Sequence, residues 1–396
     1  MTRISTAHAY DLTITRLSQR QRELVDTQSH ISSNKRVLRA SDDPVAAARA
    51  ERALATIARS EAGLRSVDAS RNAMTQAESA LGEAVELLQR AREALVAGGD
   101  ASYDEPQRKA LAGQIRDLRA QLLGVANRSD GAGGWLFSGQ GSSTPPFVDA
   151  AGGVRYNGTP GSALAGAGLP MTLDGAAAWL TAPSGNGVFE TRAVGATASA
   201  WIDAGQVTDP AALTGSSYRI EFEVAGSVTT YSVFENGAPT PLAGVAYVAG
   251  QAIEFDGLAV TVKGAPAAGD AFEIVPSTPT LGVFDMLDRA ADELETPLRS
   301  PGQMAQATAT GLRDIDALLA RIGATRSGAG EALHAIDAAE GRLAEAGYQG
   351  EVERSAAEDL DLVSALSDLQ SQQTAYETAL QAYASVQRLS LFDYIR

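Results

Sequence analysis

Side chains that could carry out chemistry are few and scattered along this chain. The three histidines, His8, His30 and His334, show no spacing typical of a metal-binding helix. His8 and His30 fall in a segment with helical periodicity, where a solvated helix surface is the simplest interpretation. The chain has no cysteine, which excludes a disulfide, a thiol nucleophile and a cysteine-ligated metal. We therefore predict no enzyme activity and no cofactor or metal.

The adjacent carboxylates of Asp42 and Asp43 allow two interpretations. Neighbouring carboxylates can bind a cation. However, Pro44 follows directly, and proline suits the first turn of a helix because its missing N–H would have no partner there. Aspartate is also a favoured N-cap residue. We therefore predict that Asp43 and Pro44 form the cap of a long helix.

Three tryptophans, Trp135, Trp179 and Trp201, lie in or beside a glycine-rich central zone. Aromatic rings on a sheet can form a carbohydrate-binding surface, although packing in a core is their commoner role. A secreted carbohydrate-binding adhesin therefore stays open as an alternative function.

The composition restricts the partners and the location of the protein. The formal net charge of −16 disfavours nucleic acid and anionic membranes, because both attract cationic surfaces. No run of apolar residues is long enough to cross a bilayer, and the first 30 residues lack the apolar segment of a cleaved secretory signal. We expect a protein that stays in the cytoplasm or is exported without a cleaved signal peptide.

Periodicity divides the chain into helical ends and a β-rich middle. The motif YRIEFEV alternates apolar and charged residues from Tyr218 to Val224, as a half-buried strand does. Asn236–Gly237 and Asp256–Gly257 are signals for tight hairpin turns. The predicted fold is mainly α, with a long antiparallel coiled-coil-like rod formed by both chain ends and a small inserted antiparallel β domain. The predicted segments are an N-terminal helix (1–43), an N-terminal rod arm (44–138), the β domain (139–278), a C-terminal rod arm (279–350) and a C-terminal helix (351–396).

Apolar stripes at both ends of the chain alternate between steps of four and three residues, as coiled-coil seams do. Gln21, Gln28 and Gln373 interrupt the two stripes. Each stripe is either the core face of an ordinary amphipathic helix or half of an antiparallel pairing between the chain ends. The predicted interface residues are Tyr10, Ile14, Leu17, Leu24 and Ile31, together with Leu362, Leu366, Leu369, Tyr376, Leu380 and Tyr383.

Several long motifs resemble the flagellin and hook-associated family of bacterial flagellar proteins. ISSNKRVLRASDDPVAAARA (31–50) is similar to the family's N-terminal signature, and ANRSDGAGGWLFSGQGSSTPPF (126–147) is similar to its passage from helix to β domain. SDLQSQQTAYETALQAYASVQRLSLFDYI (367–395) resembles its C-terminal helix, and VKGAPAAGDAFEI (262–274) resembles a β element of hook-associated proteins. The resemblance covers both helical arms well and the middle only loosely.

This resemblance implies a structural subunit that is exported through the flagellar apparatus with an uncleaved N-terminal region. The implied position is the junction of hook and filament, with hook-associated protein 1 on one side and flagellin on the other. Copies of the chain itself in a helical lattice and a cytoplasmic export chaperone are further implied partners. In this interpretation the terminal stripes are the assembly interface. A flagellin filament subunit is the alternative within the family.

Overall fold

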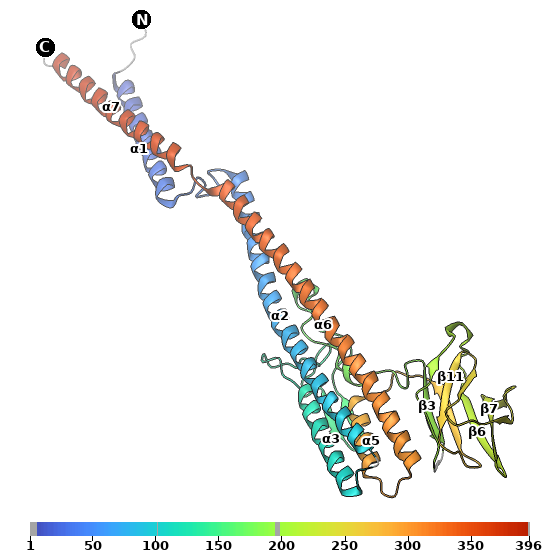
Figure 1. The fold of residues 1–396 in the computed structure, drawn as a ribbon. Helices are drawn as coiled ribbons and strands as arrows, with labels where there is room; N and C mark the ends of the chain where they lie inside the picture. Colours follow the sequence, from blue (N-terminus) through green and yellow to red (C-terminus); the bar gives the residue numbers. More distant parts are fainter. Residues whose placement is uncertain (1–5, 101, 195–198, 395–396) are drawn as a thin grey trace. The chain divides into compact units, whose positions relative to one another are not determined.

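The computed structural model describes residues 6–100, 102–194 and 199–394, except for the side chains of residues 6–10, 167 and 386–394. Two compact units make up the chain, and we describe each separately: unit 1 consists of residues 1–65 and 340–396, and unit 2 of residues 66–339. Two long helices contribute to both, α2 (Pro44–Gly98) and α6 (Pro301–Glu358) (Figure 1). None of the helices in the described ranges combines the length and hydropathy that a bilayer-spanning segment needs.

In unit 2, residues 66–98 of α2 run antiparallel to residues 301–339 of α6. Three ion pairs define the register: Arg71–Asp337, Glu78–Arg326 and Arg92–Asp316. The residue numbers rise along α2 while those of the partners fall along α6, as in an antiparallel pair. Fully buried apolar side chains fill the space around the pair, as the stripes of both segments predict: Met74, Leu81, Leu88 and Leu95 of α2, and Ile315, Ile322 and Ile336 of α6.

Two further helices pack beside this pair, α3 (Glu105–Ala126) and α5 (Val283–Glu295) (Figure 1). Asp104 and Gln107 form a capping box at the start of α3, because each side chain accepts a hydrogen bond from the other residue's backbone N–H at 2.9 Å. Arginines join α3 to α5: Arg116 contacts Glu295 at 2.6 Å and Arg119 contacts Asp288 at 2.8 Å. Unit 2 therefore contains a bundle of four neighbouring helical segments.

An aromatic cluster fills the space between α5 and the connection that follows α3. This connection carries the hairpin of β1 (Phe147–Ala150) and β2 (Gly153–Tyr156), the short turn η1 (Gly166–Gly168) and the short helix α4 (Gly175–Trp179). Trp179 is 0% exposed, lies edge-on to Phe137 at 5.4 Å and stacks on Phe284 at 6.2 Å between ring centroids. Trp179 is therefore a core residue and cannot present a ring to a carbohydrate.

The β domain between α4 and α5 consists of two antiparallel sheets. In the described residues, one sheet has the order β3-β12-β6-β7-β8 with β9 beside β7, and the other has the order β10-β11-β4 with β5 beside β11. The turn η2 (Pro210–Ala212) lies between β5 and β6. The strands are β3 (Phe189–Val194), β4 (Trp201–Ile202), β5 (Gln206–Val207), β6 (Tyr218–Ala225), β7 (Val228–Glu235), β8 (Ala238–Pro239), β9 (Val245–Ala246), β10 (Ala252–Phe255), β11 (Leu258–Lys263) and β12 (Ala271–Pro276).

Residues from both sheets share one core, as in a β-sandwich. Phe222 and Phe272 of the first sheet belong to the same buried cluster as Val260 and Val262 of the second. The predicted hairpin turns are confirmed: Asn236 and Asp256 have φ of +48° and +44°, each before a glycine that also has positive φ. Such backbone conformations match the twist of the paired strands.

Unit 1 contains α1 (Thr6–Ser33), α7 (Leu362–Tyr394) and the adjoining ends of α2 and α6. The boundary predicted between residues 350 and 351 does not coincide with the end of a helix, since α6 continues through Gly347 and Gly350 to Glu358. A Cβ at Gly350 would lie 2.9 Å from the Ile57 side chain, and one at Gly347 would lie 3.5 Å from Ser60. These glycines therefore allow α6 to approach α2 closely. The boundaries of the five segments otherwise remain a prediction.

Candidate assembly interface

The ends of the terminal helices are set by local hydrogen bonds. Asn34 has φ of +55°, its N–H donates to the Ile31 carbonyl, and the Lys35 N–H donates to the His30 carbonyl. This is a Schellman motif, which ends α1 at a left-handed residue. The Asp361 carboxylate accepts from the N–H of Val363 at 3.0 Å and caps the start of α7. Asn34 and Asp361 are the signals by which the sequence could have placed both ends.

The two connections next to these helices, residues 34–43 and 359–361, are joined by a polar joint centred on Arg36. Lys35 and Asp359 form an isolated β-bridge, and the Arg36 N–H donates to the Glu358 carbonyl at 2.6 Å. The Arg36 guanidinium donates to the Ala357 carbonyl at 2.8 Å and to Asp43 at 3.1 Å. The joint therefore ties the segment before α2 to the segment after α6.

Asp43 lies at the N-terminus of α2, with Pro44 as the first helical residue. Its carboxylate accepts from the N–H groups of Val45 and Ala46 at 3.1 and 3.0 Å. The hydrogen bond from the Ala46 N–H lowers the pKa of the Asp43 carboxyl most, and the hydrogen bond from Arg36 lowers it further. Asp42 accepts instead from the N–H groups of Leu38 and Arg39, which closes the preceding turn. Among the described residues no group of histidine, cysteine or acidic side chains could hold a metal ion.

Helices α1 and α7 lie antiparallel to each other, with a shared seam of half-buried side chains (Figure 1). One series recurs every seven residues on each helix: Leu17, Leu24 and Ile31 of α1, and Leu369, Tyr376 and Tyr383 of α7. Smaller or polar residues fill the positions between them, and the Thr27 hydroxyl donates to the Gln372 amide oxygen at 3.0 Å. The chain ends therefore meet within one molecule.

The other half of each predicted stripe stays outside this seam. Ile14 is 44% exposed on α1, and Leu362, Leu366 and Leu380 are 43%, 53% and 39% exposed on α7. The side chain of Tyr10 lies outside the described residues. The predicted interface residues therefore separate into a set that contacts the partner helix and a set that faces solvent.

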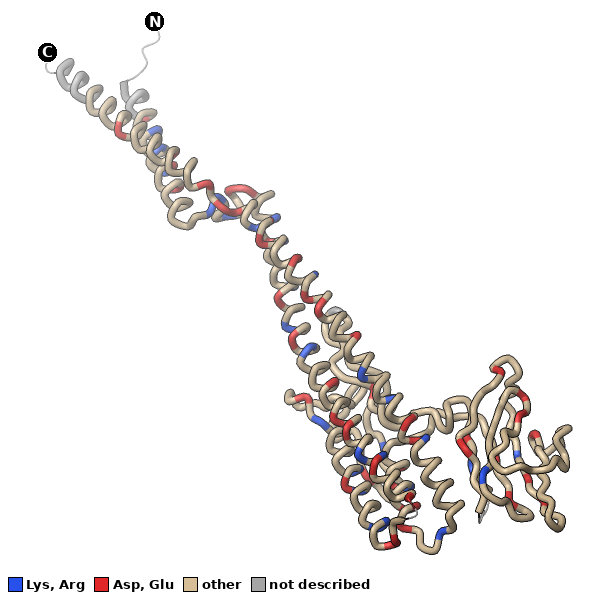
Figure 2. The backbone as a smooth tube through the Cα atoms, viewed as in Figure 1, with Lys and Arg blue, Asp and Glu red and all other residues tan. Residues whose placement is uncertain are grey.

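Charged side chains are unequally distributed between the two terminal helices. Figure 2 shows them at several places along α1 but rarely along α7. Between Leu362 and Ser385 the only charged residues are Asp368 and Glu377. A helix surface with so little charge can be covered by protein without the cost of burying ionised groups.

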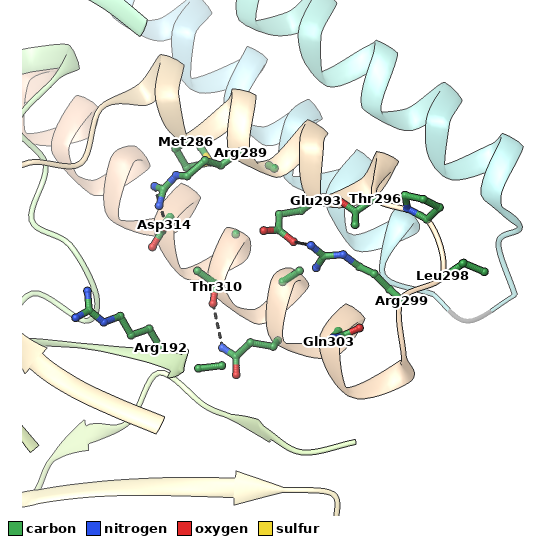
Figure 3. A pocket seen from close by; sticks show the side chains of 16 residues that line it. Arg192, Met286, Arg289, Glu293, Thr296, Leu298, Arg299, Gln303, Thr310 and Asp314 are labelled. Atoms are coloured by element: carbon green, nitrogen blue, oxygen red, sulfur yellow. Dashed lines mark hydrogen bonds and ion pairs between the residues drawn. The ribbon is translucent and has the colours of Figure 1, made fainter. Parts of the chain in front are cut away.

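The charged side chains around a cavity of unit 2 are paired with one another. A cavity of about 540 Å³ lies between α5, α6 and β3, and Figure 3 shows Arg192, Arg289 and Arg299 around it. Arg299 is paired with Glu293, and Arg289 lies 3.5 Å from Asp314. The arginines of the cavity therefore already have carboxylate partners.

Asp314, beside this cavity, has a structural role in holding the β domain on α6. Burial raises the pKa of its carboxyl, against the opposing effect of Arg313, whose guanidinium donates to it at 2.9 Å. Arg313 also donates to the Thr191 carbonyl of β3 at 3.1 Å. The Gln306 amide oxygen accepts from the Ile202 N–H of β4 at 2.9 Å. These contacts explain why charged and polar groups are buried here without a catalytic arrangement.

Comparison with known proteins shows which proteins parts of this chain resemble. The family model of the bacterial flagellin N-terminal helical region matches residues 4–142. The model of the D2-like domain of flagellar hook-associated protein 1 matches residues 190–276, which make up most of the β domain. One chain thus contains a region similar to the flagellin N-terminal helices and a region similar to the D2-like domain of hook-associated protein 1.

The chain is also similar to flagellar hook-associated protein 3. It is 31% identical to that protein from Salmonella typhimurium over 157 residues, which are 39% of this chain and 48% of the relative. The match to the Escherichia coli protein is also 31% identical, over 37% of this chain and 46% of that protein. These matches span about half the length of the curated relatives.

Solved structures extend the similarity to most of the chain. The crystal structure of flagellar hook-associated protein 3 from Legionella pneumophila has a TM-score of 0.71 at 28% identity and covers 76% of this chain and 97% of that one. A crystal structure of Xanthomonas campestris FlgL has a TM-score of 0.68 at 27% identity and covers 77% and 99%. A helical bundle with an inserted β domain is therefore an architecture that this chain shares with these solved structures.

Proposed function

We propose that this chain is a structural subunit at the hook–filament junction of the bacterial flagellum, where it joins hook-associated protein 1 to flagellin. One observation carries this proposal: the same chain contains a flagellin-like helical region and a β domain like that of hook-associated protein 1. A subunit with features of both neighbours is suited to a place between them. Its similarity to proteins named as hook-associated protein 3 and as a flagellar junction protein supports this position.

The interface in this proposal is formed by α1 and α7, through which copies of the chain assemble into a helical lattice. Two properties support this role. The helices bury only half of their apolar stripes against each other, and α7 carries little charge. The subunit is extracellular and leaves the cell by the flagellar export route without a cleaved signal, with a cytoplasmic chaperone bound to α7 before export. The role is structural and involves no catalysis.

Deletion of the gene in its own organism tests the proposal. Cells without the protein should keep hooks but lose filaments, and flagellin monomers should accumulate in the medium. Electron microscopy counts the hooks and filaments, and immunoblotting of culture supernatant measures the flagellin. Expression of the intact chain should restore attachment. Normal filaments in the deletion strain would show that the junction role is wrong, and loss of the filament protein itself would support the flagellin alternative.

A further inference from the structure

Three asparagines of unit 2 directly precede a glycine: Asn157, Asn186 and Asn236. In such a pair the glycine backbone nitrogen can attack the side-chain amide carbon of asparagine, because glycine has no Cβ to shield that nitrogen. The attack requires that the asparagine amide turn toward the glycine nitrogen. All three asparagines are exposed. Burial therefore does not distinguish them, whereas the hydrogen bonds of each amide do.

The side-chain amide of Asn186 is held at both of its ends. Its oxygen accepts from the N–H groups of Val188 and Phe189 at 3.0 and 2.9 Å, and its nitrogen donates to two carbonyls of the loop between β4 and β5. The N–H of Gly187, which carries the attacking nitrogen, donates to the Ser184 carbonyl at 3.3 Å. Both reacting groups of this pair are therefore occupied.

The amide of Asn236 is also held on both sides, in the hairpin turn between β7 and β8. Its oxygen accepts from the Ser217 N–H at 3.2 Å, and its nitrogen donates to the Ser216 hydroxyl at 3.1 Å. Both hydrogen bonds have to break before the amide carbon can approach the nitrogen of Gly237. The turn therefore protects this asparagine although it is exposed.

The pair of Asn157 and Gly158, directly after β2, has no such protection. The backbone N–H of Asn157 donates to the Pro146 carbonyl at 2.8 Å. No residue in the described part of the chain forms a hydrogen bond with the side-chain amide of Asn157 or with the N–H of Gly158. Both reacting groups are therefore free in the folded protein.

We propose that Asn157 is a site of spontaneous deamidation in the folded chain. The nitrogen of Gly158 forms a bond to the Asn157 Cγ, the bond from Cγ to Nδ2 breaks, and the proton lost by the Gly158 nitrogen leaves with the ammonia through solvent. Water then opens the resulting imide ring. Addition at Cγ gives aspartate, and addition at the backbone carbonyl carbon gives isoaspartate.

This reaction consumes only water, releases only ammonia and changes no oxidation state. It needs no enzyme, so the product accumulates with time after synthesis. The proposal goes beyond the proposed function and does not depend on it, because it concerns the chemistry of one loop of unit 2.

Isoaspartate at this position would disturb the packing of the loop. The main chain then runs through the former side chain, which inserts one more carbon atom before Gly158. The segment is anchored after this point as well, since the Thr159 N–H donates to the Ser138 carbonyl at 3.2 Å. A Cβ at Gly158 would lie 2.4 Å from the ring of Tyr156, which in turn packs on Phe147 at 5.1 Å between centroids. An extra backbone atom therefore strains the edge of the aromatic cluster.

Peptide mapping by mass spectrometry tests the site, because it follows the three asparagines separately in one sample. The full-length chain is incubated in neutral buffer, folded or unfolded in urea. In the folded chain we expect Asn157 to deamidate at least about tenfold faster than Asn186 or Asn236, since breaking ordinary hydrogen bonds costs the other two about one decade in rate. In urea the three rates should be similar. Equal rates in the folded chain, or a slower rate at Asn157, would overturn the proposal.

A variant tests whether the hydrogen bonds are the cause. Ser216→Ala removes one partner of the Asn236 amide and should raise deamidation at Asn236 by about threefold to tenfold, as the loss of one ordinary hydrogen bond allows. The rate at Asn157 in the same chain is the internal control and should not change. An unchanged rate at Asn236 in a variant with normal circular dichroism would show that the hydrogen bonds do not protect the site.

Asn157→Gln tests the consequence for the loop, because glutamine keeps an amide but its longer side chain does not form the same ring. Aged unmodified chain should contain isoaspartate at position 157 and melt at a lower temperature than fresh chain. Aged and fresh Asn157→Gln should melt alike. Aged unmodified chain that contains the isoaspartate and still melts like fresh chain would contradict the strain at Tyr156.

Discussion

Single side chains define where the helices of this protein begin and end. Asp43, Asp104 and Asp361 cap the starts of α2, α3 and α7, and Asn34 ends α1 with a left-handed backbone. Each acts through hydrogen bonds to backbone groups that a helix end leaves without partners. These residues therefore set the lengths of the helices independently of the distant core.

The cap at Asp43 predicts a loss of stability in Asp43→Ala and a smaller loss in Asp43→Asn, whose amide oxygen can still accept. Thermal unfolding followed by circular dichroism measures both. The pKa of Asp43 is lower in the folded protein, so its contribution is present above the ordinary value of about 3.9 and is lost as the pH falls through the folded value. The difference between Asp43→Ala and the unmodified chain should therefore shrink in acid. A melting temperature that depends on calcium or on a chelator would contradict the cap.

The buried ring of Trp179 predicts a core role that excludes carbohydrate binding. Trp179→Ala should lower the free energy of unfolding of unit 2 by about 3–5 kcal/mol, because it leaves a cavity among Phe137, Phe147 and Phe284. Urea unfolding measures this change. Trp201→Ala is the control, since Trp201 is only half-buried and lies under Lys263 at 4.8 Å. Equal, small effects of both changes would contradict the core assignment.

At the scale of elements, close packing and polar joints determine how the segments meet. Gly350 lets α6 approach α2, and in unit 2 Gly98 and Gly311 are similarly close to Leu294 and Leu95. Arg36 joins the connection before α2 to the end of α6, and Arg313 joins β3 to α6. The elements therefore meet through a few small or charged residues as well as through apolar faces.

The joint in unit 1 predicts that Arg36→Ala loosens both connections without unfolding the helices. The side chain donates two charge-assisted hydrogen bonds, but it is 47% exposed, and solvent screening limits its contribution to about 1 kcal/mol or less. Hydrogen exchange followed by mass spectrometry should be faster in residues 34–43 and 359–361. The nearby exposed Arg39→Ala is the control and should leave the exchange unchanged. Unaltered exchange in Arg36→Ala would mean that backbone contacts alone hold the joint.

At the scale of the whole molecule, the chain divides its apolar surface between its own fold and the proposed assembly. Unit 2 contains a core of fully buried aromatic and aliphatic side chains, among them Met74, Leu88 and Phe284. The α1–α7 pair buries only part of its stripes and leaves Ile14, Leu366 and Leu380 exposed to solvent. The proposed assembly would use the exposed part of the stripes, while the buried core stabilises the single chain.

The difference between half-buried and exposed stripe residues predicts different consequences for two aspartate substitutions. Leu17→Asp should disrupt the α1–α7 pair, since burial of a leucine contributes about 2–3 kcal/mol and the charge would have no partner. Leu380→Asp should leave the pair intact, because Leu380 is already 39% exposed. Both should abolish filament attachment in cells, whereas Glu377→Lys should be far milder. Hydrogen exchange of α1 and α7 separates the first two, and export is checked by immunoblotting of the medium. Full filaments with either aspartate at normal export would contradict the role of the terminal helices.

Local patterns along the sequence were enough to predict the helical arms, the inserted β domain and several of its strands. The alternation from Tyr218 to Val224 and the turns at Asn236 and Asp256 depend on backbone preferences within a few residues. The end of α2 at Gly98 has a similarly local origin. Such features could be predicted because the interactions that stabilise them come from residues close together in the sequence.

Only the tertiary structure decided which residues of the repeating stripes meet a partner. Periodicity assigned Leu17 and Ile14, or Tyr376 and Leu380, to one face, but the register of α1 against α7 leaves one residue of each pair half-buried and the other exposed. Gly347 and Gly350 are residues that often end a helix, but here they lie inside α6 and leave room for Ser60 and Ile57 of α2. Trp179 likewise becomes a core residue through rings distant in sequence. In each case the outcome depends on a contact between segments far apart in the chain, and the amino-acid pattern of one segment does not contain the position of the other.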